Sequence, residues 1–172
     1  KINTGQASCT LAGGIEMMSR VPMLSDQAAM FADAELALDN RMLMMGSGAD
    51  LIASLHNISR KQVDDIAFQS QQRAALARCK KHFKSIIPVY NPSKDTWVTE
   101  DECIREELSL ADLAKLKPYF AELGANGVDA LQLSEHTHLS TISHVHTAGN
   151  SPAMADAASL VMIGNSSLQD QG

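Results

Sequence analysis

Three cysteines and six histidines are the side chains of this sequence whose chemistry could be nucleophilic or metal-binding. Cys9, Cys79 and Cys103 are odd in number and widely spaced, which argues against a disulfide framework and against a C-x-x-C metal knuckle. This pattern favours a reducing, cytoplasmic setting. Cys9 lies in a short apolar run, so it is interpreted as a small core side chain rather than as a nucleophile.

Four of the histidines are close together in the sequence, at His136, His138, His144 and His146. Alternate residues of an extended strand share a face, so such a group raises the hypothesis of a metal site. No cysteine is nearby, and ligand type without tetrahedral geometry is a weak signal. Ordinary hydrogen-bonded histidines are therefore favoured, and no metal ligand is predicted.

The charges are distributed unevenly. The net charge is -6, which argues against nucleic acid as a partner, because binding to polyphosphate needs a clustered positive field. However, 11 of the 14 Lys and Arg lie between Arg60 and Lys117, against 9 acidic residues there. This middle part is suited to bind an anion, although solvated helix surfaces would show the same charges.

The length of 172 residues and the hydrophobic content of 45% are enough for one core, or for one domain with a sub-domain. No apolar run approaches the ~20 residues that a membrane-spanning helix needs. Residues 1–5 show no initiator Met and no secretory signal. We therefore expect a piece that starts inside a structural element.

Two apolar runs predict buried strands. Residues 7–12 form the first, closed by a tight turn at Gly13-Gly14, and residues 160–163 form the second, ended by Gly164. Residues 19–43 show no sustained period and predict irregular chain with short helical pieces. Residues 95–105 predict an extended, polar stretch, and residues 124–143 a loop.

Helix-capping patterns predict four helices between these strands. Ser59 with Gln62 caps the most regular one, which runs to about residue 81. The other three predicted starts are Ser47 with Asp50, Ser109 with Asp112, and Ser151 with Pro152 at the first helical position. The order of strand, mostly helical insertion, short helix and strand favours an α/β layer that carries a lid.

Four blocks in this order resemble the thiolase family and together span nearly the whole chain. The family patterns are A-G-G-x-E-x-M-S-x-x-P, the lid helix, D-E-x-x-R with L-A-x-L-K-P-x-F, and T-A-G-N with D-G-A-A. Their counterparts here are residues 12–22, residues 59–77, residues 101–105 with 113–120, and residues 147–150 with 156–158.

The resemblance implies an α/β, thiolase-like fold in part, with core strands of the N-terminal domain and a long, mostly helical lid insertion. The implied division is core strand and turn over residues 1–22, lid over 23–146, and return to the core over 147–172. It implies an acyltransferase that cleaves 3-oxoacyl-CoA with CoA, or runs the reverse condensation. The implied partners are CoA and acyl-CoA as substrates and identical subunits in a homodimer or homotetramer, with no permanently bound cofactor.

The family uses a nucleophilic Cys, a His and a second Cys, but their motifs C-x-S-x, G-H-P and C-x-G do not occur here. No catalytic residue is therefore assigned, and this chain alone is expected to be inactive. The alternative hypothesis is a stand-alone, non-catalytic module that binds CoA or another protein.

By motif position, seven residues are implied to contact CoA. Arg105 would lie at the adenine end, where a guanidinium can stack on the base or bind phosphate. Leu113, Leu116 and Phe120 would supply apolar wall, although the helical spacing of the two leucines also fits an ordinary core. The others are Met45 beside the acyl pocket, and Ala148 and Ser151 beside the pantetheine.

Three features depart from the family pattern. Pro152 replaces a common Ser whose hydroxyl lies near the pantetheine amide, so this hydrogen bond is lost or moved to Ser151, with a cost of about 1 kcal/mol if nothing replaces it. Met44 stands where the family often has His. The link over residues 122–144 is longer than in minimal thiolases and resembles a longer-linked branch.

Overall fold

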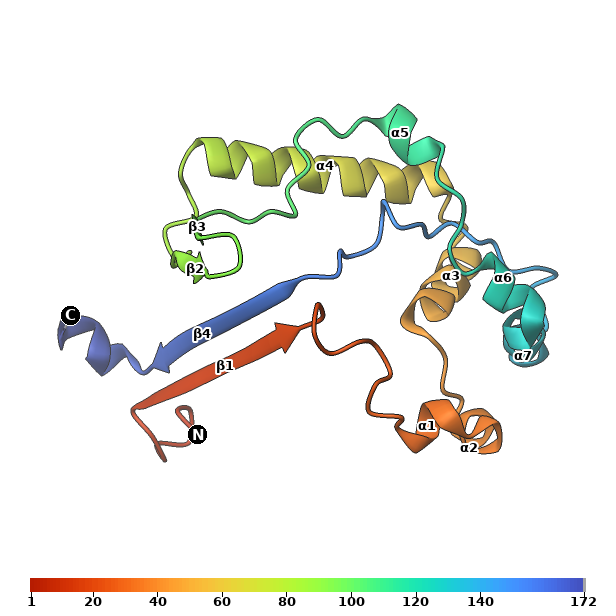
Figure 1. Ribbon diagram of the computed structural model, residues 1–172. Helices are drawn as coiled ribbons and strands as arrows, with labels where there is room; N and C mark the ends of the chain where they lie inside the picture. The colour runs from red at the N-terminus through yellow and green to blue at the C-terminus, as the bar shows by residue number, and fades with distance from the viewer. Residues whose placement is uncertain (172) are drawn as a thin grey trace. The chain divides into compact units, whose positions relative to one another are not determined.

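The computed structural model describes the backbone of residues 1–171, and the side chains of this range except at residues 31, 32, 34, 35, 38 and 169–171. The chain separates into two compact units, which are residues 1–28 with 154–172, and residues 29–153. The elements, labelled in Figure 1, are β1 (Cys9–Met17), α1 (Ala29–Ala32), α2 (Ala34–Asp39), α3 (Met45–Leu55), α4 (Arg60–Cys79), β2 (Val89–Asn91), β3 (Thr96–Val98), α5 (Leu110–Ala114), α6 (Ala121–Leu123), the π-helix η1 (Gly124–Val128), α7 (Asp129–Glu135), β4 (Asp156–Gly164) and the 3-10 helix η2 (Ser166–Gln171).

The first unit is built on an antiparallel ribbon of β1 and β4, paired from Cys9 opposite Gly164 to Met17 opposite Asp156. Both strands were predicted, but the turn at Gly13-Gly14 was wrong, because both glycines lie inside β1. Gly13 is needed there for close approach, since a Cβ atom on it would come within 2.5 Å of the Ser159 carbonyl oxygen.

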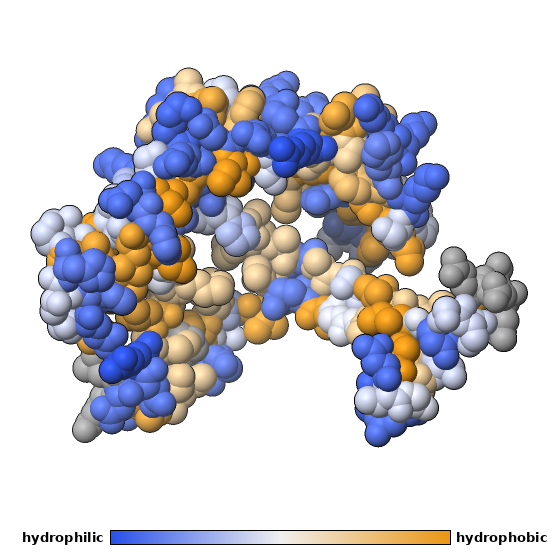
Figure 2. All heavy atoms as spheres, turned by 180° about the vertical axis from the view of Figure 1, so that it is seen from behind, coloured by the Kyte–Doolittle hydropathy of each residue, from blue (hydrophilic) through white to orange (hydrophobic). Residues whose placement is uncertain are grey.

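The apolar side chains of the ribbon are exposed. The prediction that both strands are buried is therefore wrong within this chain. Leu160 and Met162 remain 72% and 71% exposed, and Cys9 is exposed as well. The interpretation of Cys9 as a core side chain is therefore wrong for this chain. Apolar residues are also visible at the surface on the face drawn in Figure 2.

In the second unit, α4 is the longest helix and begins where the sequence predicts. The Ser59 hydroxyl accepts a hydrogen bond from the Gln62 amide, and the Gln62 side chain accepts one from the Ser59 amide at 2.8 Å. The Ser109 hydroxyl caps α5 in the predicted way. These capping signals are confirmed because each depends on residues only three positions apart.

The other two predicted helix starts are wrong. Helix α3 begins at Met45, with Met44 as its N-cap, so Ser47 and Asp50 lie inside the helix and do not cap it. No helix follows Ser151, because the turn of residues 147–150 leads through irregular chain directly into β4.

Of two segments predicted to lack helix, the first is helical and the second contains a strand, in agreement with its predicted extended form. Residues 121–135, most of which were predicted as loop, form α6, η1 and α7, with Gly127 at a φ of 121° where the helical path is broken. The polar stretch after residue 95 contains β3, which pairs with β2 in a short hairpin.

The core of the second unit contains more polar than apolar residues. Its buried apolar members are Ala53, Leu113, Ile142 and Val145, and its buried polar members are Ser47, Asp50, Ser54, Asp64, Gln132 and Thr147. Buried polar groups are costly unless they are hydrogen-bonded. The hydrogen bonds of these residues therefore decide how the segment after α7 is held.

Candidate functional site

A cleft of about 450 Å³ lies within the second unit, between α4 and the segment of residues 146–153. It falls in the size range of ligand pockets. The α4 wall is mainly apolar and includes Val63, Ile66 and Ala67. The opposite wall contains the turn of residues 147–150, and the segment around Arg105 closes one side.

Hydrogen bonds position Arg105 against α4. The Gln71 side chain accepts a bond from the Arg105 backbone amide at 2.7 Å, and the Gln72 side chain donates to the Glu106 carbonyl oxygen at 3.2 Å. The Glu106 carboxylate is paired with Arg78 at 2.6 Å. Within the part of the chain that the structure describes, the Arg105 guanidinium has no ion pair, so its charge is available to an anionic ligand.

The turn of residues 147–150 is held by its own side chains. The Asn150 side-chain oxygen accepts a bond from the Thr147 amide at 2.8 Å, and its nitrogen donates to Asp64 of α4 at 2.8 Å. Asp64 is itself buried and paired with Arg60 at 2.8 Å. Asn150 therefore links the turn to the first turns of α4 and fixes the width of the cleft.

Leu113 and Leu116 support this turn and are not among the residues that line the cleft. A Cβ atom on Gly149 would lie 2.5 Å from a terminal methyl of each leucine, so a larger residue there would force the leucine side chains to shift. Leu113 is fully buried. The sequence offered two interpretations of the leucines, and the core role describes the place of Leu113. Contact of either leucine with a ligand stays a prediction.

The seven residues predicted to contact CoA are thus brought together only in part. Arg105, Ala148 and Ser151 line the same cleft, although they come from separate parts of the sequence. Met45 is 90% exposed at the start of α3. The Phe120 ring packs against Gly46 and is not among the residues that line the cleft.

The residues that line this cleft but were not predicted as site residues include Ser70, Cys103 and His146. Cys103 lies inside the D-E-x-x-R block and His146 directly precedes the T-A-G-N block, so both had a signal in the sequence. Ser70 lies on α4, inside the lid-helix block of residues 59–77, so it also had a signal in the sequence.

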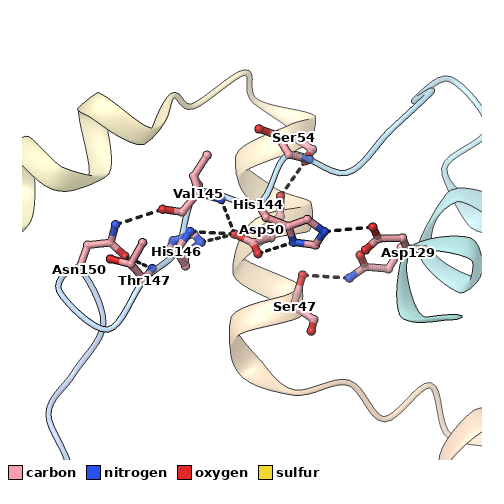
Figure 3. A network of polar contacts seen from close by, with 11 residues as sticks. Ser47, Asp50, Ser54, Asp129, His144, Val145, His146, Thr147 and Asn150 are labelled. Carbon is pink, nitrogen blue, oxygen red and sulfur yellow. Dashed lines mark hydrogen bonds and ion pairs between the residues drawn. The ribbon is translucent and has the colours of Figure 1, made fainter. Parts of the chain in front are cut away.

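Asp50 is a further residue whose role here sequence reasoning missed, because it was predicted only as part of a helix-capping pair. It is fully buried on α3 and accepts four hydrogen bonds from residues 144–146, which Figure 3 shows converging on its carboxylate. The donors are His144 Nδ1 at 2.9 Å, His146 Nδ1 at 2.7 Å, and the backbone amides of Val145 and His146 at 3.0 and 3.1 Å. These partners lie 94 to 96 positions later in the chain, so no local spacing in the sequence indicates that Asp50 binds them.

His144 lies between two carboxylates. Its Nδ1 faces Asp50 at 2.9 Å and its Nε2 faces Asp129 at 3.0 Å. Burial disfavours the charged ring, but the hydrogen bonds and the negative charges of Asp50 and Asp129 together outweigh burial and raise the pKa of His144. Through these two contacts the ring ties α3 to α7.

The histidines do not form a metal site in the region described. His144 and His146 are engaged by Asp50, whereas the His136 and His138 rings contact each other edge to face at 6.0 Å. Residues 1–171, as far as the structure describes their side chains, contain no group of three or more His, Cys, Asp or Glu that could hold a metal ion.

The three cysteines are free. No helix in the described residues is long and apolar enough to cross a membrane.

A sequence model of the thiolase N-terminal domain matches residues 1–135. The chain belongs to the thiolase family. It is 32% identical over 166 residues to the 3-ketoacyl-CoA thiolase of Photorhabdus laumondii, a match that covers 94% of this chain and 38% of that protein. The corresponding enzyme of Aliivibrio fischeri is 33% identical over the same length. The chain therefore spans about two fifths of these relatives.

Solved thiolases confirm the partial thiolase-like α/β fold. The human mitochondrial 3-ketoacyl-CoA thiolase in complex with CoA has a TM-score of 0.66 and 25% identity, with 98% of this chain and 40% of that chain covered. The dimeric peroxisomal thiolase of Saccharomyces cerevisiae has a TM-score of 0.68 and 24% identity, with 99% and 39% covered.

Proposed function

We propose that this chain is part of a thiolase-type acyltransferase that cleaves 3-oxoacyl-CoA with CoA to acetyl-CoA and a shortened acyl-CoA, or catalyses the reverse condensation. Family membership supports this proposal, together with the CoA bound to the human relative. The whole enzyme is proposed to be a cytoplasmic homodimer or homotetramer with CoA as a substrate and no permanently bound cofactor. The name of the yeast relative as a dimer supports the oligomer.

The observation that carries the proposal is the cleft that brings Arg105, Ala148 and Ser151 together. An unpaired guanidinium at one side suits the phosphates or the adenine of CoA. The apolar α4 wall and the small residues of the turn suit the narrow pantetheine arm. We propose that residues 23–146 act as the lid over this ligand, with the flanking residues 1–22 and 147–172 belonging to the catalytic core layer.

Replacement of Arg105 tests the binding site in the enzyme made from the complete reading frame. Arg105→Ala is expected to raise the KM for CoA about tenfold in the thiolysis of acetoacetyl-CoA, because a charge-assisted contact worth roughly 1.5 kcal/mol is lost. The kcat is expected to change little. With pantetheine in place of CoA as the thiol acceptor, the effect of the substitution should vanish, since pantetheine lacks the nucleotide.

Arg73→Ala is the matched control, because Arg73 is an exposed arginine of α4 that bonds only to Gln69 among the contacts described. An unchanged KM for CoA in Arg105→Ala would contradict the binding site. Absence of thiolysis by the wild-type enzyme would contradict the acyltransferase itself.

The alternative function is a stand-alone, non-catalytic module that binds CoA or another protein, for which the same cleft would serve. It predicts saturable binding of CoA without turnover by the product of the complete reading frame. The 172-residue chain by itself is expected to show no turnover under either function.

A further inference from the structure

The buried carboxylate of Asp50 fixes the hydrogen-bonding state of His146. A carboxylate can only accept a hydrogen bond, so the 2.7 Å contact requires that the Nδ1 of His146 carries the proton and donates it to Asp50. In the neutral ring the other nitrogen, Nε2, is then an acceptor. The backbone amide of His146 also donates to Asp50, so the residue is held at two points.

His146 differs from its neighbour His144 in what its second nitrogen contacts. The Nε2 of His144 is engaged by Asp129. Among the contacts between residues that the structure describes, the Nε2 of His146 has no hydrogen-bond partner, and the side chain keeps 18% of its surface exposed. His146 is also one of the residues that line the cleft. Its acceptor nitrogen is therefore not taken by another described residue of the chain.

Several other polar atoms on this wall are already occupied. The Asn150 side chain donates to Asp64 and to the Val145 carbonyl oxygen, and its oxygen accepts from the Thr147 amide. The Thr147 hydroxyl is buried against the Gly149 amide. Pro152 has no N–H to donate. Among the described contacts, the Ser151 hydroxyl and the ring Nε2 of His146 remain as side-chain acceptors for an N–H group of a ligand on this side, and Nε2 is the one whose proton state the fold fixes.

We propose that His146 binds the pantetheine arm of CoA, with its Nε2 accepting a hydrogen bond from an amide N–H of that arm, and that Asp50 is the positioning residue that holds the ring in the required tautomer. This inference rests on the proposed function, because it takes CoA as the ligand. Pantetheine is suited to the contact because it is a narrow chain with two amide N–H groups.

Two substitutions separate the two nitrogens of His146 in the complete enzyme. His146→Asn places an amide nitrogen near the position of Nδ1 and keeps the bond to Asp50, but it removes Nε2. His146→Gln places a polar atom near the position of Nε2 and loses the anchor to Asp50. His146→Asn is expected to raise the KM about three- to tenfold for both CoA and pantetheine, with kcat within twofold, whereas a purely structural role would make His146→Gln the more damaged variant.

Pantetheine analogues in which one amide N–H is replaced by an ester oxygen test the bond without any substitution. The wild-type enzyme should lose about three- to tenfold in KM with one of the two analogues, and His146→Asn should be insensitive to the same change. Equal KM values for pantetheine and both analogues in the wild-type enzyme would overturn the proposal, even if His146→Asn fails to fold.

The outcomes distinguish the inference from the function beneath it. A wild-type enzyme that turns over CoA, with a His146→Asn variant of unchanged KM, overturns the role of His146 and leaves the acyltransferase intact. A wild-type enzyme that neither binds nor turns over CoA overturns both. Because Arg105→Ala is expected to affect CoA alone, a loss with pantetheine assigns the His146 contact to the arm and not to the nucleotide.

Discussion

Asp50→Ala is predicted to free the segment of residues 142–150 from α3. The substitution removes the acceptor of two backbone amides, those of Val145 and His146, and of two imidazole rings. The side chains of His144 and His146 are 14% and 18% exposed to solvent, so their rings can turn toward water. The two amides cannot do so, because Val145 is only 3% exposed and its backbone path is fixed by the turn that follows.

The expected magnitude follows from these two amides. Leaving a buried donor without an acceptor costs about 1–3 kcal/mol, so the pair contributes about 2–6 kcal/mol. Loss of the buried negative charge offsets part of this cost, because that charge is itself expensive to desolvate. We expect the local opening free energy of residues 142–150 to fall by about 3–4 kcal/mol, which is roughly a hundred- to a thousandfold increase in amide exchange.

Hydrogen exchange measured by mass spectrometry checks this prediction, with peptides from residues 142–150 compared with peptides from α4. Asp50→Asn should show a smaller loss of about 1–2 kcal/mol, because its side-chain oxygen still accepts from both amides. Asp65→Ala is the control, since Asp65 is also a helical aspartate but forms an exposed ion pair with Lys61 that contributes at most about 0.5 kcal/mol. Unchanged exchange in Asp50→Ala, or an equal change in Asp65→Ala, would refute the reasoning.

Two further predictions concern His144 and the glycines of α3. The folded state raises the pKa of His144. Its contribution to the free energy of unfolding is therefore complete below the unfolded pKa of about 6.5 and is lost as pH rises through the folded pKa. Urea denaturation at a series of pH values should show this fall in the wild-type chain and not in His144→Gln. Gly46→Ala should destabilise the fold by about 1–3 kcal/mol, because the new methyl group would overlap the Phe120 ring. Gly48→Ala, with open space around it, should stabilise the fold by about 0.5–1 kcal/mol. Thermal unfolding in which both substitutions have the same effect would contradict the packing of Phe120 on Gly46.

Several elements of this chain could be predicted from sequence because their signals are local. The capping box of Ser59 and Gln62 and the periodic apolar positions behind it give α4, and Ser109 gives the start of α5. The apolar run at residues 160–163 gives the central part of β4. In each case residues within one or two turns, or within one strand, supply both the pattern and the contacts that satisfy it.

The same kind of pattern failed where distant residues compete for the same atoms. Ser47 and Asp50 have the spacing of a capping pair, but the Asp50 carboxylate is taken by residues 144–146, almost a hundred positions later. Ser151 with Pro152 has the composition of a helix start, but Asn150 closes the turn of residues 147–150 and the chain runs on into β4. Gly13-Gly14 reads as a turn, yet it lies inside a strand because β4 approaches closely there.

By itself, the sequence determined the family, through ordered motif blocks, and the helices that carry their own capping groups. Only the tertiary structure decided which of the motif residues share one cleft, such as Arg105 and Ala148. The turn that carries Ala148 is held by the packing of Leu113 and Leu116 on Gly149. It is also held by the hydrogen bond from Asn150 to Asp64. It also decided the role of His146, since the proton position on that ring depends on a buried carboxylate from another helix. Such contacts join residues far apart in the chain, and no local spacing encodes them.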